Sequence, residues 1–393
     1  MSRDLPIFTP PGAGHPHAFE PPTIAMAGML DVPGEHVPGE HGPGEPGVPG
    51  SRRTVPPSGR AAPPSGRAAP PPVPNGRGPL PHRHPDWIRA RIPTGERYFE
   101  LKGLMRGLTL HTVCEEARCP NIGECWDQRT ATVMILGDVC TRACGFCAIK
   151  TGRPTWFDDD EPRRVAEAVA QMDLDHCVVT SVARDDLPDG GAGAFAETIR
   201  QLRARCPGMG VEVLIPDFNG DEAPLRTVME AGPDILNHNV ETVARLQKPV
   251  RKRARYDRSL GVLERAKAYA REIAGHAGTV HTKSSIMVGL GETHDELVQT
   301  FRDLRAVDCD ILTLGQYLRP SEQHLPVERY YTPQEFVELR EEALALGFRH
   351  VESGPLVRSS YHARNQVPDA ERRAMERAAL RAAAAAGGAA LDD

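Results

Sequence analysis

Three cysteines in the first half of the chain have a spacing suited to iron chemistry. Cys140, Cys144 and Cys147 form a Cys-x3-Cys-x2-Cys array with the letters Cys-Thr-Arg-Ala-Cys-Gly-Phe-Cys. A cubane 4Fe-4S cluster usually takes four cysteine ligands, so three thiolates suit three of its irons and leave the fourth open. An open coordination position is what separates a catalytic metal site from a structural one. The spacing therefore predicts a reactive cluster.

A structural zinc site is the alternative for the same array. Such sites generally combine two separated pairs of ligands of the form Cys-x2-4-Cys. No paired Cys or His follows Cys147 at a suitable spacing. The sequence favours the cluster over zinc.

A second triple of cysteines lies just upstream. Cys114, Cys119 and Cys125 form a Cys-x4-Cys-x5-Cys array, so two triples fall within 34 residues. A second cluster is the interpretation we favour, and three buried thiols in a helical capping segment are the alternative. The three remaining cysteines are isolated in apolar or helical contexts and are expected to be small core residues; they are Cys177, Cys206 and Cys309.

The elements that must position these cysteines follow a regular alternation. From about residue 130, short β-branched runs alternate with longer segments of helical spacing, which is typical of β/α units in a parallel sheet. The expected strands are 132–136, 177–182, 211–215, 235–240, 284–290 and 310–316. The expected helices are 161–172, 192–205, 222–231, 257–276, 293–307 and 333–346.

Polar residues follow each expected strand. Reactive groups of barrels and open parallel sheets lie at the carboxyl ends of the strands, so we expect these residues to converge on one face of an α/β fold. They are, in strand order, Cys140, Arg184 to Asp186, Asp217, Glu241, Glu292 and Arg319. Gly289 to Glu292 opens a helix after a strand, but a Gly-x-Gly without its third glycine does not indicate a Rossmann site.

The downstream array resembles the cluster motif of the radical S-adenosylmethionine (SAM) superfamily, Cys-x3-Cys-x-aromatic-Cys, with Phe146 as the aromatic residue. The resemblance implies a partial parallel (β/α)6 TIM-like barrel. It also implies that the open iron chelates the amino and carboxylate groups of SAM. An injected electron then cleaves the sulfonium to a 5'-deoxyadenosyl radical, which breaks unactivated C–H bonds.

The upstream array resembles the auxiliary-cluster motif of the lipoyl synthase family. The similarity runs from residue 86 to 365, through 180–191, 237–246 and 315–320, and ends in Arg358-Ser359-Ser360-Tyr361. It implies two 4Fe-4S clusters, with Ser360 as the fourth ligand of the auxiliary one beside Cys114, Cys119 and Cys125. The implied reaction inserts two sulfur atoms, taken from that cluster, at C6 and C8 of a protein-bound octanoyl-lysine. Cys140, Cys144, Cys147 and Ser360 are its catalytic residues.

Two rival functions share part of the pattern. A biotin-synthase-like enzyme would carry the Cys140 array but not the Cys114 triple. A non-catalytic electron-transfer protein with two clusters would not need a barrel around an open iron.

A further set of residues is expected to contact SAM or the acyl substrate, because each lies in or next to the cluster motif or near a strand end. The alternative for each is a structural salt bridge or cap. The set is Phe146, Thr180, Arg184, Asp185, Asn239, Glu241 and Arg319.

The resemblance also implies partners. These are octanoylated lipoyl carrier domains (2-oxoacid dehydrogenase E2 subunits and glycine cleavage H protein), a ferredoxin- or flavodoxin-type electron donor, and an iron–sulfur carrier that repairs the consumed cluster. The basic run from Lys248 to Arg258 is either a solvated face or a docking site for an acidic carrier.

Composition limits the other classes of partner. The net charge of −6 and pI near 6.2 give no reason to expect nucleic-acid binding. No window approaches the ~18 apolar residues of a transmembrane helix, and Met1 to Pro11 lacks the apolar region of a signal peptide. Nine cysteines in such a chain favour a reducing compartment, and we expect a cytoplasmic protein.

Five segments are expected along the chain. Residues 1–85 are rich in Pro and Gly and carry local repeats, which predicts a disordered extension, with a targeting peptide as the alternative. Residues 86–130 should hold the auxiliary cysteines, 131–350 the barrel, and 351–368 the return to the auxiliary cluster. Residues 369–393 form an Ala-rich helical tail.

Overall fold

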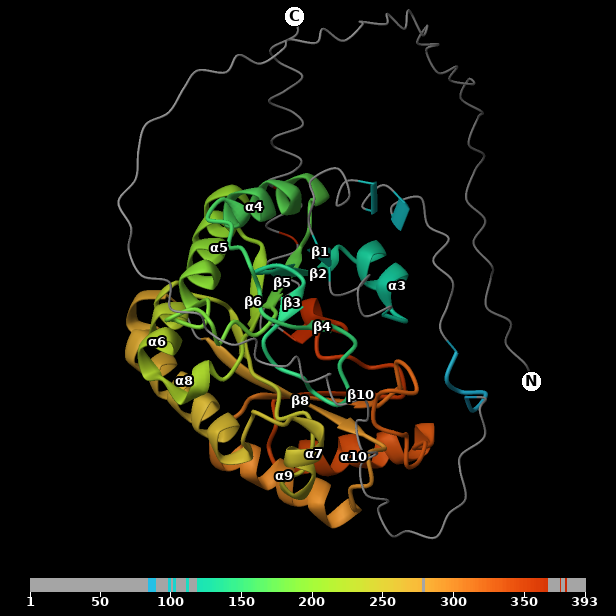
Figure 1. The fold of residues 1–393 in the computed structure, drawn as a ribbon. Coiled ribbons are helices and arrows are strands. Elements are labelled where there is room, and N and C mark those ends of the chain that lie inside the picture. The colour runs from blue at the N-terminus through green and yellow to red at the C-terminus, as the bar shows by residue number, and fades with distance from the viewer. Residues whose placement is uncertain are drawn as a thin grey trace, which may run out of the picture. The chain divides into compact units, whose positions relative to one another are not determined.

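A parallel sheet flanked by helices organises the protein (Figure 1). The computed structural model describes residues 84–89, 98–99, 102–103, 111–112, 119–277, 280–366, 375 and 379, all within one compact unit, Ala68–Asp393. Residues 1–83 of the predicted disordered extension lie outside the described residues. The predicted tail also lies outside them, except for positions 375 and 379. Cys114 lies outside them as well.

Eight strands form the main sheet, in the order β1-β2-β5-β6-β7-β8-β9-β10. All neighbours pair in parallel except β1, which is antiparallel to β2. The strands are β1 (His111–Thr112), β2 (Thr130–Ile135), β5 (His176–Ser181), β6 (Gly210–Leu214), β7 (Ile235–Asn237), β8 (His281–Val288), β9 (Ile311–Gln316) and β10 (His350–Gly354). A separate two-stranded ladder joins β3 (Val139–Cys140) to β4 (Lys150–Thr151).

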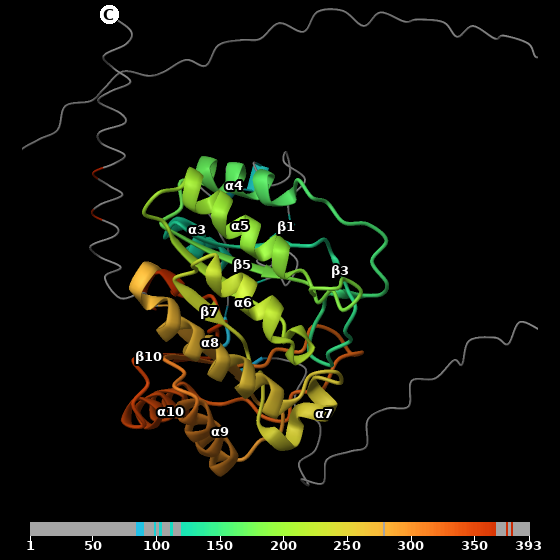
Figure 2. The same ribbon diagram turned by 90° about the vertical axis from the view of Figure 1, so that its left-hand side faces the viewer.

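Six long helices follow strands β2 and β5 to β9. They are α4 (Glu161–Met172), α5 (Ala192–Arg205), α6 (Glu222–Glu230), α8 (Tyr256–Ala277), α9 (His294–Ala306) and α10 (Pro333–Ala345). Figure 2 shows them as one layer in chain order along the same face of the sheet. Their starts are encoded locally: Thr293 and Thr332 each close a capping box with the Glu three residues later.

Shorter helices fill the connections. They are α3 (Ile122–Asp127), α7 (Gln247–Val250) and the 3-10 turns η1 (Phe218–Gly220), η2 (Ala244–Leu246) and η3 (Ala363–Gln366). No helix in the described part of the chain is long and apolar enough to cross a bilayer.

The two faces of the sheet differ in chemistry. Val211 and Val213 of β6 pack into the apolar core shared with the helices. Glu212 lies between them and therefore points to the opposite face, where its Oε1 is 2.9 Å from Nζ of Lys283 on β8, and both side chains are fully buried. This face of the sheet therefore buries a carboxylate and an ammonium group that pair with each other.

The α/β fold with six β/α units is confirmed. Each expected strand and helix is present, with shifts of a few residues at the ends. A seventh parallel strand, β10, was not expected from the sequence; it pairs with β9 and spans the expected boundary between residues 350 and 351. Its letters, His-Val-Glu-Ser-Gly, contain a single β-branched apolar residue, so the period-2 pattern that identified the other strands is absent.

Candidate functional site

The loop after β2 brings Cys140, Cys144 and Cys147 together at the carboxyl end of the sheet. Cys140 is held by the β3–β4 ladder, where its carbonyl accepts from the Gly152 N–H at 2.9 Å. Two backbone N–H groups also point at its sulfur, from Arg142 at 3.4 Å and Ala183 at 3.3 Å. Hydrogen bonds to sulfur are one means by which proteins tune iron–sulfur clusters, so this environment fits a cluster ligand.

The thiols of this loop lie close enough to influence one another. Burial raises the pKa of Cys144 to about 12; Arg251 opposes this shift, and Cys147, Glu241 and Cys140 reinforce it. Burial also raises the pKa of Cys147. A neutral thiol is therefore favoured without a metal, whereas metal binding requires thiolates and would displace these protons. The three thiols share one loop, but among the described residues no three His, Cys, Asp or Glu side chains are grouped closely enough to hold a metal ion.

Gly145 fits the turn between the second and third cysteines because a side chain would not. A Cβ on Gly145 would lie 2.9 Å from the Leu325 side chain and 3.1 Å from the Pro249 carbonyl oxygen. Its own N–H donates to Val250 O at 2.8 Å, and its carbonyl accepts from Leu325 N at 3.0 Å. The turn is thus held between two loops, and Phe146 beside it packs against the apolar core that includes residues of β8, β9, α9 and α10.

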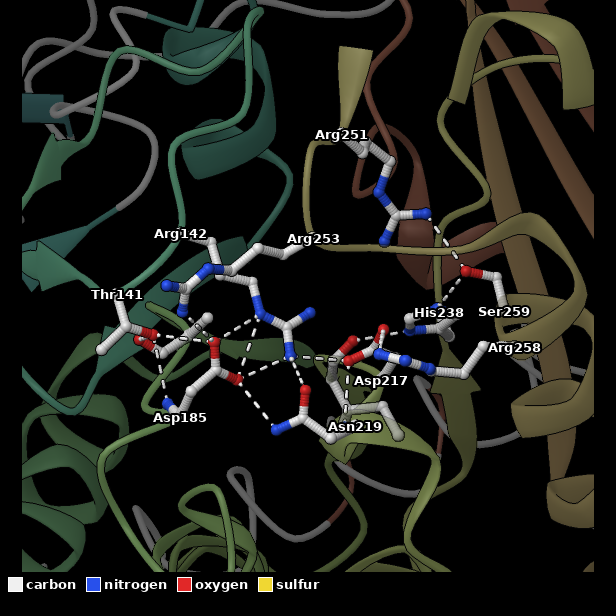
Figure 3. Close-up of polar contacts among 12 residues, drawn as sticks. Thr141, Arg142, Asp185, Asp217, Asn219, His238, Arg251, Arg253, Arg258 and Ser259 are labelled. Atoms are coloured by element: carbon white, nitrogen blue, oxygen red, sulfur yellow. Dashed lines mark hydrogen bonds and ion pairs between the residues drawn. The ribbon is translucent and has the colours of Figure 1, made fainter. Parts of the chain in front are cut away.

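A buried arginine within the cysteine array anchors the loop (Figure 3). The Arg142 Nη2 atom lies 2.6 Å from Oδ1 of Asp185, after β5, and 2.7 Å from Oδ1 of Asp217, after β6. Although burial opposes it, Arg142 holds the pKa of both carboxyl groups below the ordinary value. Thr141 adds a hydrogen bond to Asp185 at 3.1 Å. The cluster loop is therefore bound to the ends of two neighbouring strands.

The same network extends to a neutral histidine (Figure 3). The second carboxylate oxygen of Asp217 pairs with Arg258 at 3.2 Å. His238 is buried between Ile215 O at 2.9 Å and the Ser259 hydroxyl at 3.0 Å, and that hydroxyl also accepts from Arg251. Burial and the nearby Arg251 lower the pKa of His238 to about 4. Its ring is therefore uncharged near neutral pH.

A cavity apart from the Cys140 loop contains the other expected cluster ligands that the structure describes. Cys119, Cys125 and Ser360 line a small hollow together with Arg358 and Tyr361. Threonines 130 and 132 of β2 and Asn121 complete its wall. Burial raises the pKa of Cys119, while a backbone hydrogen bond and Arg358 oppose that shift. A cation beside a thiol favours the thiolate, which is the form that binds iron.

Glu124 connects the two chain segments around this cavity. It lies on α3, next to Cys125, and its carboxylate accepts from the Tyr361 hydroxyl at 3.1 Å and contacts His362 Nε2 at 3.2 Å. The rings of Tyr361 and His362 stack with centroids 3.7 Å apart, and His362 has a left-handed φ of 52°. These contacts hold the turn that carries Ser360 against the helix that carries Cys125.

Some expected SAM contacts lie beside the cluster loop. Glu241 is near Cys144 and Cys147, accepts from Asn239 Nδ2 at 3.1 Å, and has a pKa raised by burial. Thr180 lies at the end of β5 and donates to Leu214 O at 3.0 Å. Glu241 and Asn239 therefore place a carboxyl and an amide group beside the loop of Cys144 and Cys147.

Other expected contacts are occupied by protein groups. Arg184 is buried and binds Asp186 and the Leu136 carbonyl oxygen. Asp185 is engaged by the Arg142 network, and Arg319 is exposed and donates to carbonyl oxygens of its own loop. Arg184 and Asp185 therefore connect different loops, whereas Arg319 stabilises its own loop.

The sequence analysis did not single out Arg142, Glu124 or Arg358 as site residues. Arg142 and Arg358 were within quoted motifs, so their positions were a usable signal. Their acidic and thiol partners come from other strands, however, and Glu124 pairs with residues more than 230 positions away. Sequence spacing carries no information on such contacts.

Two protein-family models match segments of the chain that contain most of the expected cluster cysteines. The family model described as the radical SAM superfamily matches residues 134–304. A second model, described as the N-terminal domain of lipoyl synthase of the radical SAM family, matches residues 73–119.

Curated relatives cover most of the chain. A lipoyl synthase of Rubrobacter xylanophilus is 60% identical over 294 residues, which are 75% of this chain and 89% of the relative. A lipoyl synthase of Symbiobacterium thermophilum is 62% identical over 288 residues, 73% of this chain and 88% of the relative. One of Koribacter versatilis is 59% identical over 74% of this chain and 93% of the relative.

Proposed function

The chain belongs to the lipoyl synthase family, and from that premise we propose which of its residues hold the two clusters that this enzyme uses. It is a radical SAM sulfurtransferase that inserts two sulfur atoms, at C6 and C8, into a protein-bound octanoyl-lysine, with SAM and two 4Fe-4S clusters as cofactors. Cys140, Cys144 and Cys147 hold the reducing cluster. The auxiliary, sulfur-donating cluster is held by the ligand set Cys114, Cys119, Cys125 and Ser360.

The observation that carries this proposal is the cavity between α3 and the C-terminal turn. Cys119 and Cys125 meet Ser360 there, although 235 residues separate Cys125 from Ser360 along the chain. A hydroxyl is a harder donor than a thiolate and matches soft iron–sulfur chemistry less well. A weaker oxygen ligand suits a cluster that must release one iron as it gives up sulfur.

The remaining expected site residues have two roles: some would contact SAM, and others hold the surrounding loops. When bound, the reducing cluster and SAM supply the radical that removes hydrogen from the acyl chain. Asn239 and Glu241 are suited to hold the SAM ammonium, since a buried carboxylate favours a cationic partner. Phe146 and Thr180 line the same region. Arg184, Asp185 and Arg319 position the loops around it.

The reaction partners follow from the substrate. Lipoyl synthase acts on lipoyl carrier proteins. We propose E2 subunits of 2-oxoacid dehydrogenases and glycine cleavage H protein as the carriers, a ferredoxin- or flavodoxin-type electron donor, and an iron–sulfur carrier for repair. A cytoplasmic location accords with the cysteines, because none of the eight that the structure describes takes part in a disulfide.

We further propose a role for each segment of the chain. Residues 86–130 carry the auxiliary cysteines, 131–350 the radical SAM barrel, and 351–368 the turn with Ser360. Residues 1–85 and 369–393 are appended segments. Truncation to residues 73–368, which keeps the whole match to the N-terminal domain of lipoyl synthase, should therefore retain both clusters and turnover, which iron counting and product analysis would test.

Iron counting on matched variants tests the ligand assignment. After anaerobic reconstitution the native chain should hold about eight irons, four for each cubane. Cys144→Ala and Cys125→Ala should each hold about four, and Cys309→Ala, which removes a buried core thiol, should keep about eight. About four irons in the native chain would contradict the two-cluster assignment.

Mass spectrometry of an octanoylated carrier peptide tests the reaction itself. Incubation with SAM and a reductant should add two sulfur atoms to the acyl group in the native chain and none in Cys144→Ala. In Ser360→Ala the first addition should be slowed or lost. An unchanged acyl mass with the fully loaded native chain would refute the function.

A further inference from the structure

A small cationic surface lies directly on the loop of the reducing cluster. It consists of Lys248, Lys252 and Arg253, in and after α7, and we name it the α7 basic surface. All three side chains are exposed. Figure 2 shows α7 and β3 toward the same side of the sheet, the side on which the cysteine loop emerges.

Backbone contacts join this surface to the cluster loop. Val250, between Lys248 and Lys252, accepts the hydrogen bond of the Gly145 N–H at 2.8 Å, and Gly145 directly follows Cys144. The neighbouring Pro249 carbonyl oxygen would lie 3.1 Å from a Cβ at Gly145. The backbone of the α7 surface is therefore in contact with the turn between two of the cluster cysteines.

The charge of this surface is largely uncompensated. Within the described part of the chain Lys248 and Lys252 form no ion pair, and Arg253 has a single long one, 3.7 Å to Asp185. The other arginines of the run have closer partners. Arg251 is buried against Ser259, and Arg258 turns inward to Asp217 (Figure 3). Arg255 is exposed but pairs with Asp257 at 2.5 Å. A chain with a net charge of −6 thus presents a local positive surface beside the loop of Cys140, Cys144 and Cys147.

We propose that the α7 basic surface docks the acidic one-electron donor protein that reduces the cluster, an inference that rests on the proposed ligand role of Cys140, Cys144 and Cys147. The donor loses one electron and is oxidised, and that electron would reduce the 4Fe-4S cluster that the three cysteines would hold. Redox encounters use small interfaces, and charge steers their association. A surface touching the cluster loop also gives the short separation that electron transfer needs.

The carrier domain is the other acidic partner to weigh. It presents its octanoyl group at the end of a long lysine side chain, so the acyl group can reach into the site while the body of the carrier stays at a distance. A redox centre buried in a donor protein has no such extended arm. Carrier docking therefore does not require contact with the cysteine loop itself. This difference in reach is the reason for assigning the surface to the electron donor.

Charge reversal tests the assignment. Lys248→Glu with Lys252→Glu is compared with Arg302→Glu and Arg349→Glu, the same charge change on exposed arginines of α9 and of the amino end of β10. Reduction of the loaded enzyme by reduced flavodoxin is followed by anaerobic stopped-flow. We expect the rate to fall about tenfold in the first pair at low ionic strength and to recover toward native in about 0.5 M salt, with little change in the control pair.

Three readouts separate the outcomes. With dithionite as reductant, the first pair should show native turnover and a native Michaelis constant for the octanoylated carrier. A native rate with flavodoxin would overturn the inference, and so would a raised Michaelis constant for the carrier with dithionite, which would assign the surface to the carrier. Iron content is measured first: a native chain without the cluster of Cys140, Cys144 and Cys147 would refute the ligand assignment instead.

Discussion

Replacing Arg142 with Leu should loosen the reducing cluster without removing the auxiliary one. The guanidinium is 7% exposed, and its partners Asp185 and Asp217 are 15% and 0% exposed. Breaking a buried pair by removing one partner costs about 3–5 kcal/mol. Arg258 still contacts Asp217 in the variant, so we expect the lower end, about 3 kcal/mol. If this free energy orders the cluster loop, cluster affinity falls by roughly a factor of 100, since about 1.4 kcal/mol corresponds to tenfold.

The assay counts the iron retained by one set of ligands during a chelator challenge. A Cys119→Ala, Cys125→Ala background removes the auxiliary set, so the remaining iron reports on the Cys140 loop. Arg253→Leu is the matched control, because it also removes a cation from Asp185 but at 3.7 Å and with 64% exposure, where a pair contributes at most about 1 kcal/mol.

Two outcomes decide this prediction. Much faster iron release from Arg142→Leu than from the control supports the network as the anchor of the loop. Equal release from the two variants would refute it. The helical signal in circular dichroism must be retained in both, so that unfolding is distinguished from local loosening.

Three further predictions concern other buried or linking contacts. Lys283→Met leaves Glu212 buried without its cation and should cost about 3–5 kcal/mol, whereas adding Glu212→Leu should restore much of the urea midpoint; no recovery would contradict the pairing. His238 has a folded pKa of about 4, below its ordinary value near 6.5, so the unfolded chain binds more protons between these values and stability should fall as pH drops from about 6.5 toward 4. A His238→Gln variant should flatten that dependence of the urea midpoint, and an unchanged slope would refute the assignment. Glu124→Ala should speed iron loss from the auxiliary set several-fold, because half-exposed hydrogen bonds contribute about 1 kcal/mol, while Asp127→Ala on the same helix should not; equal loss in both would count against the contact.

Local pattern was sufficient for most of the β/α units. Strand β5 and helix α4 were both recognisable, since one is a short β-branched run and the other repeats its apolar residues every three to four positions. Strand β10 was not, because its alternating residues are polar. It is held by pairing with β9 and by packing of α10, which are contacts that its own letters do not contain.

The reactive residues divide in the same way. Cys140, Cys144 and Cys147 are close in sequence, so a single loop brings them together and the motif alone predicts their chemistry. The sequence of this one chain also indicated an auxiliary cluster from Cys119 and its neighbours, but Ser360 entered through family resemblance.

What the tertiary structure decided are the contacts between distant segments. It joined Ser360 to the cavity of Cys119 and Cys125, and bound Arg142 to Asp185 and Asp217. It also showed that one basic run contains both a buried arginine, Arg251, and exposed side chains such as Lys248 and Lys252. Composition and spacing report on residues that are neighbours in sequence, whereas burial and ion pairing depend on which strand ends meet in space.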